Sequence, residues 1–129
     1  MRKRTRVVGV WDDHDYGLND GDRTFAKRDL VRDVYLDFLD EPEDSERRLE
    51  KGTGIFQDYE VRLNGVKVHL ILIDVRYDFD KPARDRFGQY QLAWLESTIA
   101  RHLDSDVTLI GLGVQGIVDR NFVTEALNW

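Results

Sequence analysis

The segment Trp11–Asp20 carries four carboxylates, an imidazole and a carboxamide within ten residues, and it directly follows the apolar run Val7–Val10. An apolar run that stops at such a polar segment is typical of a buried strand that ends in a loop, and open α/β sheets bind ligands just past the carboxyl ends of their strands. Carboxylates held close together repel one another, and a bound cation relieves that repulsion. Because hard metal ions prefer oxygen ligands, the segment predicts a metal site in which His14 is either a ligand or a proton carrier.

Two other interpretations of this acidic segment compete with a metal site of that kind. An ordinary acidic loop that faces water is common in proteins, and the residue chemistry alone leaves that alternative open. A calcium loop of the EF-hand type is excluded. Counted from Asp12 or Asp13, either the glycine has the wrong offset or the glutamate at the twelfth position is missing.

The spacing of apolar residues predicts two amphipathic helices, over residues 24–39 and 89–103. The apolar face of the first helix is expected to pack on the core rather than to form a wall for a substrate. The predicted faces consist of Val31, Val34, Tyr35, Phe38 and Leu39 in the first helix, and of Leu92, Leu95, Ile99 and Leu103 in the second.

Strands are predicted over residues 6–10, 55–63, 66–74 and 107–113. The dipeptide Asn64–Gly65 between two of these runs is the strongest short signal of a β-hairpin. The second strand of the hairpin becomes continuously apolar, which indicates that it enters a core covered on both faces. With a last helix beginning at residue 121, the order of elements predicts an α/β or α+β layered fold in one domain.

Polar residues in and after the strand 66–74 admit structural and functional interpretations. Asp74 and Arg76 either bond to neighbouring groups, or Arg76 faces a phosphate, whose geometry a guanidinium matches bidentately. His69 is interpreted as a surface residue or a hydrogen-bonded core residue. His102 lies near the end of the second predicted helix, where a cation is favoured by the helix dipole.

Composition excludes several classes of protein. Lys and Arg number 19 against 25 Asp and Glu, a net charge of −6, which argues against a broad basic face for nucleic acid. The chain has no cysteine, so disulfides and thiolate metal sites are excluded. No apolar run approaches the length of a membrane span, and no apolar segment of a secretory signal follows the basic start. Location and oligomeric state are not predicted.

The segment Trp11–Asp20, with the sequence WDDHDYGLND, resembles the signature of the PhoD-like phosphatases, a branch of the metallophosphoesterase superfamily. Four later segments are similar to landmarks of that family and occur in the family's order. They are Glu41–Arg48, the strand end Leu72–Tyr77, the helix start Gly88–Glu96 and the segment Gly113–Gln115. The resemblance covers the chain from residue 6 to residue 116.

This resemblance implies an alkaline phosphatase or phosphodiesterase that hydrolyses phosphate esters with the help of two metal ions. Some members of the family use iron with calcium, and oxygen-rich ligation is also compatible with manganese, magnesium or zinc. The implied fold is a four-layer αββα sandwich, of which this chain would be a portion. Monoesters and diesters are not distinguished.

The resemblance also implies roles for individual residues. Asp13 stands where a metal-ligating Asn usually stands, and Asp12 is a second candidate ligand. His14 matches the histidine that faces the substrate, where it stabilises the transition state or protonates the leaving group. Asp15 matches the carboxylate that orients this histidine. The candidates for contact with the phosphate or substrate are Arg76, Asn19 and Gln115.

The superfamily's first and last blocks of metal ligands have no counterpart in residues 1–129. The acidic segment supplies one or two ligands, which is too few for a dinuclear site. The sequence therefore predicts a single partial phosphatase domain, a fragment that lacks the N- and C-terminal ligand blocks. The alternative is a non-catalytic fragment or degenerate relative that acts as a small binding module.

Overall fold

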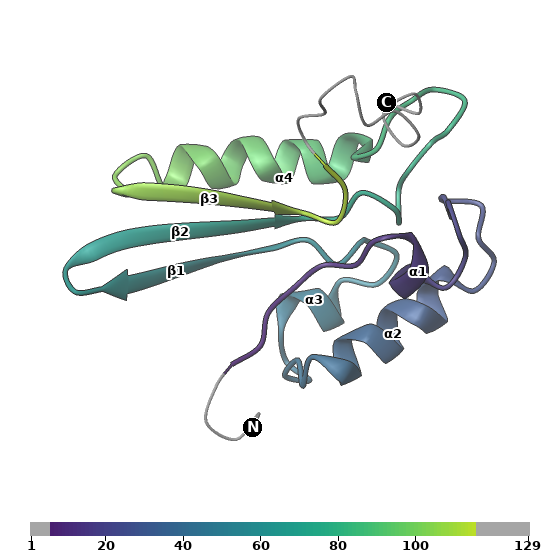
Figure 1. The fold of residues 1–129 in the computed structure, drawn as a ribbon, viewed down its shortest axis with the longest axis horizontal. Helices are drawn as coiled ribbons and strands as arrows, with labels where there is room; N and C mark the ends of the chain where they lie inside the picture. Colours follow the sequence, from purple (N-terminus) through teal and green to yellow (C-terminus); the bar gives the residue numbers. More distant parts are fainter. Residues whose placement is uncertain (1–5, 116–129) are drawn as a thin grey trace.

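The structure, a computed structural model, describes residues 6–115. Its sheet has three strands in the order β1-β2-β3, namely β1 (Gln57–Leu63), β2 (Val66–Ile73) and β3 (Val107–Leu112). The strands β1 and β2 are antiparallel, and β2 and β3 are parallel. The helix α4 (Gly88–Arg101) connects β2 to β3 and runs along the sheet (Figure 1). The fold is therefore mixed α/β, with one small mixed sheet.

Three shorter helices precede the sheet in the chain. They are α1 (Asp13–Tyr16), α2 (Arg28–Phe38) and α3 (Glu46–Leu49). Figure 1 shows them gathered near the end of β2, apart from α4. This arrangement brings the acidic segment, which contains α1, to the carboxyl end of the central strand.

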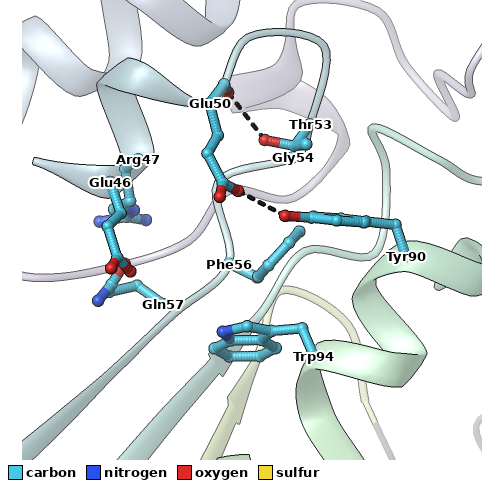
Figure 2. A pocket seen from close by; sticks show the side chains of 9 residues that line it. All are labelled: Glu46, Arg47, Glu50, Thr53, Gly54, Phe56, Gln57, Tyr90 and Trp94. Carbon is cyan, nitrogen blue, oxygen red and sulfur yellow. Dashed lines mark hydrogen bonds between the residues drawn. The ribbon is translucent and has the colours of Figure 1, made fainter. Parts of the chain in front are cut away.

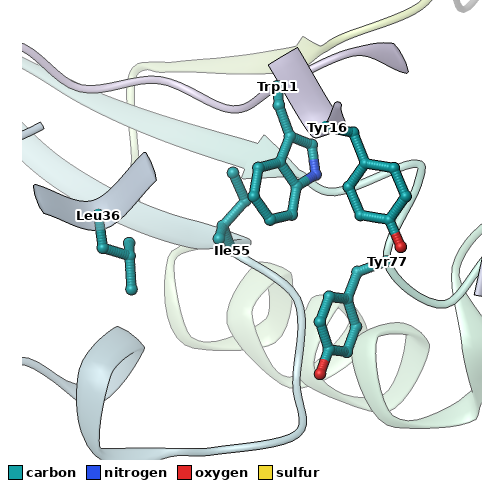
Figure 3. Close-up of a cluster of buried hydrophobic side chains, with 5 residues drawn as sticks. All are labelled: Trp11, Tyr16, Leu36, Ile55 and Tyr77. Carbon is teal, nitrogen blue, oxygen red and sulfur yellow. The ribbon is translucent and has the colours of Figure 1, made fainter. Parts of the chain in front are cut away.

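Two apolar clusters form the core. One packs Ile71, Ile73 and Val75 against α4, where Trp94 and Leu95 contact them. The other joins the segment around α1 to α2 and to the loop that follows β2. Its buried members are Trp11, Tyr16, Leu36, Ile55 and Tyr77 (Figure 3). The acidic segment is thus anchored by two fully buried aromatic rings of its own, Trp11 and Tyr16.

The predicted hairpin is confirmed. In β1 and β2, Leu63 pairs with Val66 and Gln57 with Leu72. Asn64 and Gly65 have φ of 50° and 89°, so both occupy the left-handed region that a two-residue turn between right-twisted strands requires. The apolar end of β2 is buried as expected, and the predicted last strand is present as β3.

The predicted strand over residues 6–10 is wrong. No strand is assigned there, and within residues 6–115 the sheet has three strands. The Gly9 carbonyl accepts a hydrogen bond of 3.0 Å from the Arg47 guanidinium, which is itself buried. The Arg47 side chain thus donates the hydrogen bond that the backbone of a neighbouring strand would donate in a sheet. The pattern of apolar residues does not indicate which of the two donors is present.

The predicted apolar faces of the helices are partly wrong. In α2, Val34 and Phe38 are exposed, whereas Leu36 and the charged Arg32 are buried. The Arg32 guanidinium donates to three carbonyl oxygens, those of Arg47, Glu50 and Thr53, so its burial is satisfied by hydrogen bonds. This bonding turns the face of α2 that contains Arg32 towards the core.

The buried face of α4 also differs from the predicted apolar face. The helix buries Gln91 and Thr98, whereas Leu92, Ile99 and Leu103 of the predicted face are exposed. The last predicted helix, from residue 121, lies outside the described residues. In the part of the chain that is described, no helix combines the length and apolar character needed to cross a membrane.

Candidate functional site

The acidic segment folds into one helical turn and a short loop, held at both ends of the turn. The turn α1 ends at Gly17, whose φ of 92° places it in the left-handed region common at helix ends. The Trp11 and Tyr16 rings meet edge to face with their centroids 5.2 Å apart. With both rings buried, the polar residues between them are presented from a fixed backbone (Figure 3).

Asp13 is the buried carboxylate of the turn, with 8% of its surface exposed. Its Oδ1 accepts a hydrogen bond of 2.9 Å from the His14 backbone N–H, and its Oδ2 accepts one of 3.2 Å from the Asp20 N–H. Burial raises the pKa of Asp13, but these two backbone hydrogen bonds and the charge of Arg76 outweigh it and lower the pKa. Asp13 is therefore ionised at neutral pH, the state that a metal ligand requires.

Asp12 and Arg76 form an ion pair that joins the acidic segment to the loop after β2. The Arg76 Nε and Nη2 donate to one Asp12 oxygen, Oδ1, at 2.8 and 2.5 Å. The Arg76 side chain is buried and that of Asp12 is 29% exposed. The structure thus brings together two predicted site residues that are 64 positions apart, and it pairs the positive charge of Arg76 with a carboxylate of the same site.

His14, Asp15 and Asn19 are exposed on the surface of the segment. The His14 side chain is 84% exposed, and its Nδ1 lies 3.6 Å from Asp13 Oδ1. The Asp13 carboxylate therefore lies beside this imidazole, and the orienting role of Asp15 stays a prediction. The Asn19 amide donates to Asp20 Oδ2 at 3.0 Å. These side chains are accessible to a ligand in solvent.

Gln115 is exposed at the end of the described range. The loop that carries it starts against the acidic segment. A Cβ atom on Gly113 would lie 2.1 Å from the Trp11 carbonyl oxygen and 3.2 Å from the Asp12 Cα. Only glycine permits this approach, so Gly113 places the end of β3 beside the start of the acidic segment.

Asp74 has a structural role in the same region that the sequence left open. Its carboxylate accepts hydrogen bonds from four N–H groups, three of them at Oδ1 and one at Oδ2. The donors are Trp11 Nε1 at 2.9 Å, Arg76 N at 2.8 Å, Tyr77 N at 3.0 Å and Ile55 N at 2.9 Å. The Gln91 side chain brackets the Asp74 backbone, donating to its carbonyl at 2.7 Å and accepting from its N–H at 2.8 Å. The acidic segment, the loop after β2 and the helix α4 thus converge on one buried residue.

Asp78 follows in the loop after β2 and carries the strongest perturbation of a carboxyl group in this region. Burial and then the charge of Asp74 raise its pKa from 3.8 to about 6, against the opposing charge of Arg28. Between pH 4 and 6 the folded chain therefore retains a proton that the unfolded chain has lost. The free energy of unfolding should accordingly fall as the pH rises through that window.

We expect Asp78→Asn to raise the melting temperature at pH 7 and to leave it nearly unchanged at pH 4, because the amide mimics the protonated acid. The gain at pH 7 should be on the order of 1 kcal/mol. Thermal melts of both proteins at the two pH values measure it, with the exposed Asp44→Asn as the control. An equal difference at both pH values would contradict the assignment.

A hollow with about 370 Å³ of space not filled by atoms, part of it open to solvent, lies between α3 and α4. Its rim is joined by a hydrogen bond of 2.7 Å from the Tyr90 hydroxyl to the Glu50 carboxylate (Figure 2). The residues that line it are Glu46, Arg47, Glu50, Thr53, Gly54, Phe56, Gln57, Tyr90 and Trp94. None of them belongs to the acidic segment, so the predicted site residues lie outside this hollow.

A group of possible metal ligands that the sequence analysis did not connect is formed by Asp58, His69 and His102. One ligand atom of each lies within 4.8 Å of the others. The turn Asn64–Gly65 pairs Glu60 with His69, which places Asp58 and His69 on the same face of the hairpin. That register was available from the sequence, but the position of His102 over this face was not.

Comparison of the chain with protein-family models gave no match. Comparison with curated proteins and with solved structures also gave none. The resemblance to PhoD-like phosphatases therefore rests on the sequence motifs alone.

Proposed function

We propose that the segment Trp11–Asp20 belongs to the active site of a metal-dependent phosphate ester hydrolase of the PhoD-like type. The observation that carries this proposal is the exposed His14 imidazole, which stands beside the ionised carboxylate of Asp13 on a backbone anchored by buried aromatic rings. In this proposal the three-stranded sheet is part of a four-layer sandwich, and the substrate is a phosphate monoester or diester.

The carboxylate oxygens of the segment are ligands of the kind that a hard metal ion prefers. Asp13 is ionised, and within residues 6–115 the Arg76 guanidinium bonds to Asp12 through Oδ1, so Oδ2 is the Asp12 oxygen proposed to bind the ion. Metal ions at these oxygens would neutralise the phosphate and activate a water molecule. Candidate ions are iron with calcium, or manganese, magnesium or zinc. A dinuclear site needs further ligands, which the proposal assigns to residues outside 6–115 or to another chain.

The side chains of the segment have separate roles in this mechanism. His14 faces the substrate and donates a proton to the leaving oxygen as the phosphoester bond breaks. Asp15 orients the imidazole in this proposal, and Asp13 Oδ1 lies 3.6 Å from His14 Nδ1. Asn19 and Gln115 are placed at the phosphate as hydrogen-bond donors. Arg76 contributes its charge to the site through Asp12, with which it is paired.

A second candidate function is supported by the same contacts. Asp12 is paired with Arg76, and the Asp13 carboxylate accepts two backbone N–H groups, so both carboxylates already stabilise the loop. A small non-catalytic binding module would have this internal bonding and would need no metal. The two functions differ in whether phosphate ester bonds are broken.

The experiment is a hydrolysis assay with p-nitrophenyl phosphate and bis(p-nitrophenyl) phosphate, on this chain and on the longest chain that its gene encodes. After treatment with a chelator, each protein is assayed with manganese, magnesium, zinc, or iron with calcium. We expect hydrolysis to appear with added metal and to disappear again with chelator. If the longest chain stays inert with every metal, the non-catalytic module is the correct function.

A further inference from the structure

Two of the three histidines of the chain lie together far from the acidic segment. His69 is in β2, Asp58 is in β1, and His102 directly follows α4 as its C-cap residue. In Figure 1 the end of α4 lies over the hairpin half of the sheet, whereas α1 lies at the other end of β2. The cluster Asp58-His69-His102 is thus distinct from the site proposed above.

Both imidazoles face the same carboxylate oxygen. His69 Nε2 lies 2.9 Å from Asp58 Oδ2, and His102 Nε2 lies 3.4 Å from it. The two rings lie against each other in a tilted arrangement, with their centroids 4.0 Å apart and their planes at 31°. Three potential ligand atoms from three different elements therefore converge on one point.

These distances suit a metal ion of the zinc class. Ligands bound at about 2.0–2.1 Å in a tetrahedral arrangement are separated from one another by roughly 3.4 Å. The His102–Asp58 separation already has this value, and the His69–Asp58 separation is half an ångström shorter. Widening the His69–Asp58 separation by that half ångström gives both imidazoles the spacing from Asp58 that a bound ion requires.

Burial and charge around the cluster also favour a cation. The His69 side chain is 1% exposed, Asp58 16% and His102 20%, so the ligands are largely dehydrated while one side stays open to solvent. Glu60 and Asp104 add two carboxylates nearby, and Lys67 pairs with both of them. Glu60 also pairs with the exposed Arg62 at 3.7 Å. With neutral imidazoles, the three carboxylates therefore exceed the two cationic side chains by one negative charge.

The surroundings of His102 Nδ1 support the role of His102 Nε2 as a metal ligand. His102 Nδ1 is buried without a hydrogen-bond partner, and the Glu60 Oε2 lies 3.6 Å from it. Histidines that bind metals usually donate their other ring N–H to a carboxylate, which fixes the tautomer and the ring orientation. Glu60 stands where such a carboxylate would stand.

We propose that Asp58, His69 and His102 bind one divalent metal ion such as Zn²⁺. The bound ion would link the end of α4 to the β1–β2 hairpin. Both histidines bind through Nε2, Glu60 orients His102, and a water molecule completes four-coordination. The site is built from the folded chain alone and does not depend on the proposed hydrolase function.

The test is a titration of the metal-free chain with Zn²⁺ in competition with a chromophoric chelator, and with Co²⁺, whose visible absorption reports coordination geometry. We expect one ion per chain with a tetrahedral cobalt spectrum. His102→Gln and Asp58→Asn should each weaken binding by at least about 100-fold, and Glu60→Gln by about 10- to 100-fold. Circular dichroism of the metal-free variants checks that they are folded.

His14→Gln is the matched control, because it removes the remaining histidine, which is exposed in the acidic segment. It should bind zinc like the unmodified chain. The proposal is overturned if zinc does not bind, or if folded His102→Gln and Asp58→Asn bind it unchanged. It is also overturned if His14→Gln alone loses binding. That last result would place the ion in the acidic segment and would support the proposed hydrolase site instead.

Discussion

Replacement of His14 by alanine is expected to lower kcat for phosphate ester hydrolysis by roughly 10²- to 10⁴-fold, the usual contribution of a positioned general acid. The fold should stay intact, because the side chain is 84% exposed and makes no hydrogen bond that holds the segment. The measurement is kcat for p-nitrophenyl phosphate with the metal that supports activity, alongside the melting temperature.

His14 is a sharper probe of the site than Asp13. The Asp13 carboxylate holds the backbone of His14 and Asp20, so its removal would disturb the loop as well as any metal. The control for His14→Ala is Leu18→Ala, a change of an exposed side chain in the same segment, which should keep near-full activity. Near-full turnover by His14→Ala would remove His14 from the mechanism.

Asp74→Ala is expected to lower the free energy of unfolding by about 3–5 kcal/mol, the largest stability effect that we predict for a single side chain. The change leaves four buried N–H groups without their acceptor, and each unsatisfied buried donor costs about 1–3 kcal/mol, part of which water entry recovers. Total stabilities of domains are about 5–15 kcal/mol, so the variant would be close to unfolding at 37 °C. Urea denaturation followed by circular dichroism gives the value.

Asp74→Asn gives a second measurement if the alanine variant does not fold. The amide keeps one oxygen acceptor but points its NH₂ group at an N–H donor, at Ile55 or at Trp11, Arg76 and Tyr77. We expect a loss of about 2 kcal/mol. The matched control, Asp44→Ala in an exposed turn, should change stability by less than about 0.5 kcal/mol. If Asp74 variants were as stable as this control, the four-donor arrangement would be wrong.

Elements whose signals are local could be predicted from the sequence. The hairpin is one, because Asn64 and Gly65 both tolerate the left-handed conformation that its turn requires. The buried end of β2 is another, because a continuous apolar run has few stable positions outside a core. The absence of a strand over residues 6–10 was not predictable in this way, since their apolar pattern is equally compatible with a segment outside the sheet that is bonded by a distant arginine, Arg47.

In the candidate site, too, the local features could be predicted from the sequence and the contacts between distant residues could not. The density of carboxylates around His14 is visible in the sequence, and so is the exposure that polar loops usually have. The pairing of Asp12 with Arg76 is not visible, because the residues are 64 positions apart and either could bond elsewhere. The packing of the acidic segment against the end of β2 brings Arg76 to Asp12, and contact of Arg76 with a phosphate stays a prediction.

The sequence by itself determined the hairpin, the helix between β2 and β3, and the concentration of charge in the segment Trp11–Asp20, because these depend on neighbouring residues. Only the tertiary structure decided which polar groups are buried. Arg32, Asp74 and Gln91 are buried because distant backbone groups satisfy their hydrogen bonds. His69 and His102 meet at Asp58 because α4 ends over the hairpin. Hydrophobic patterning cannot predict such positions, since a buried polar side chain is stable only where its partners from elsewhere in the chain are in place.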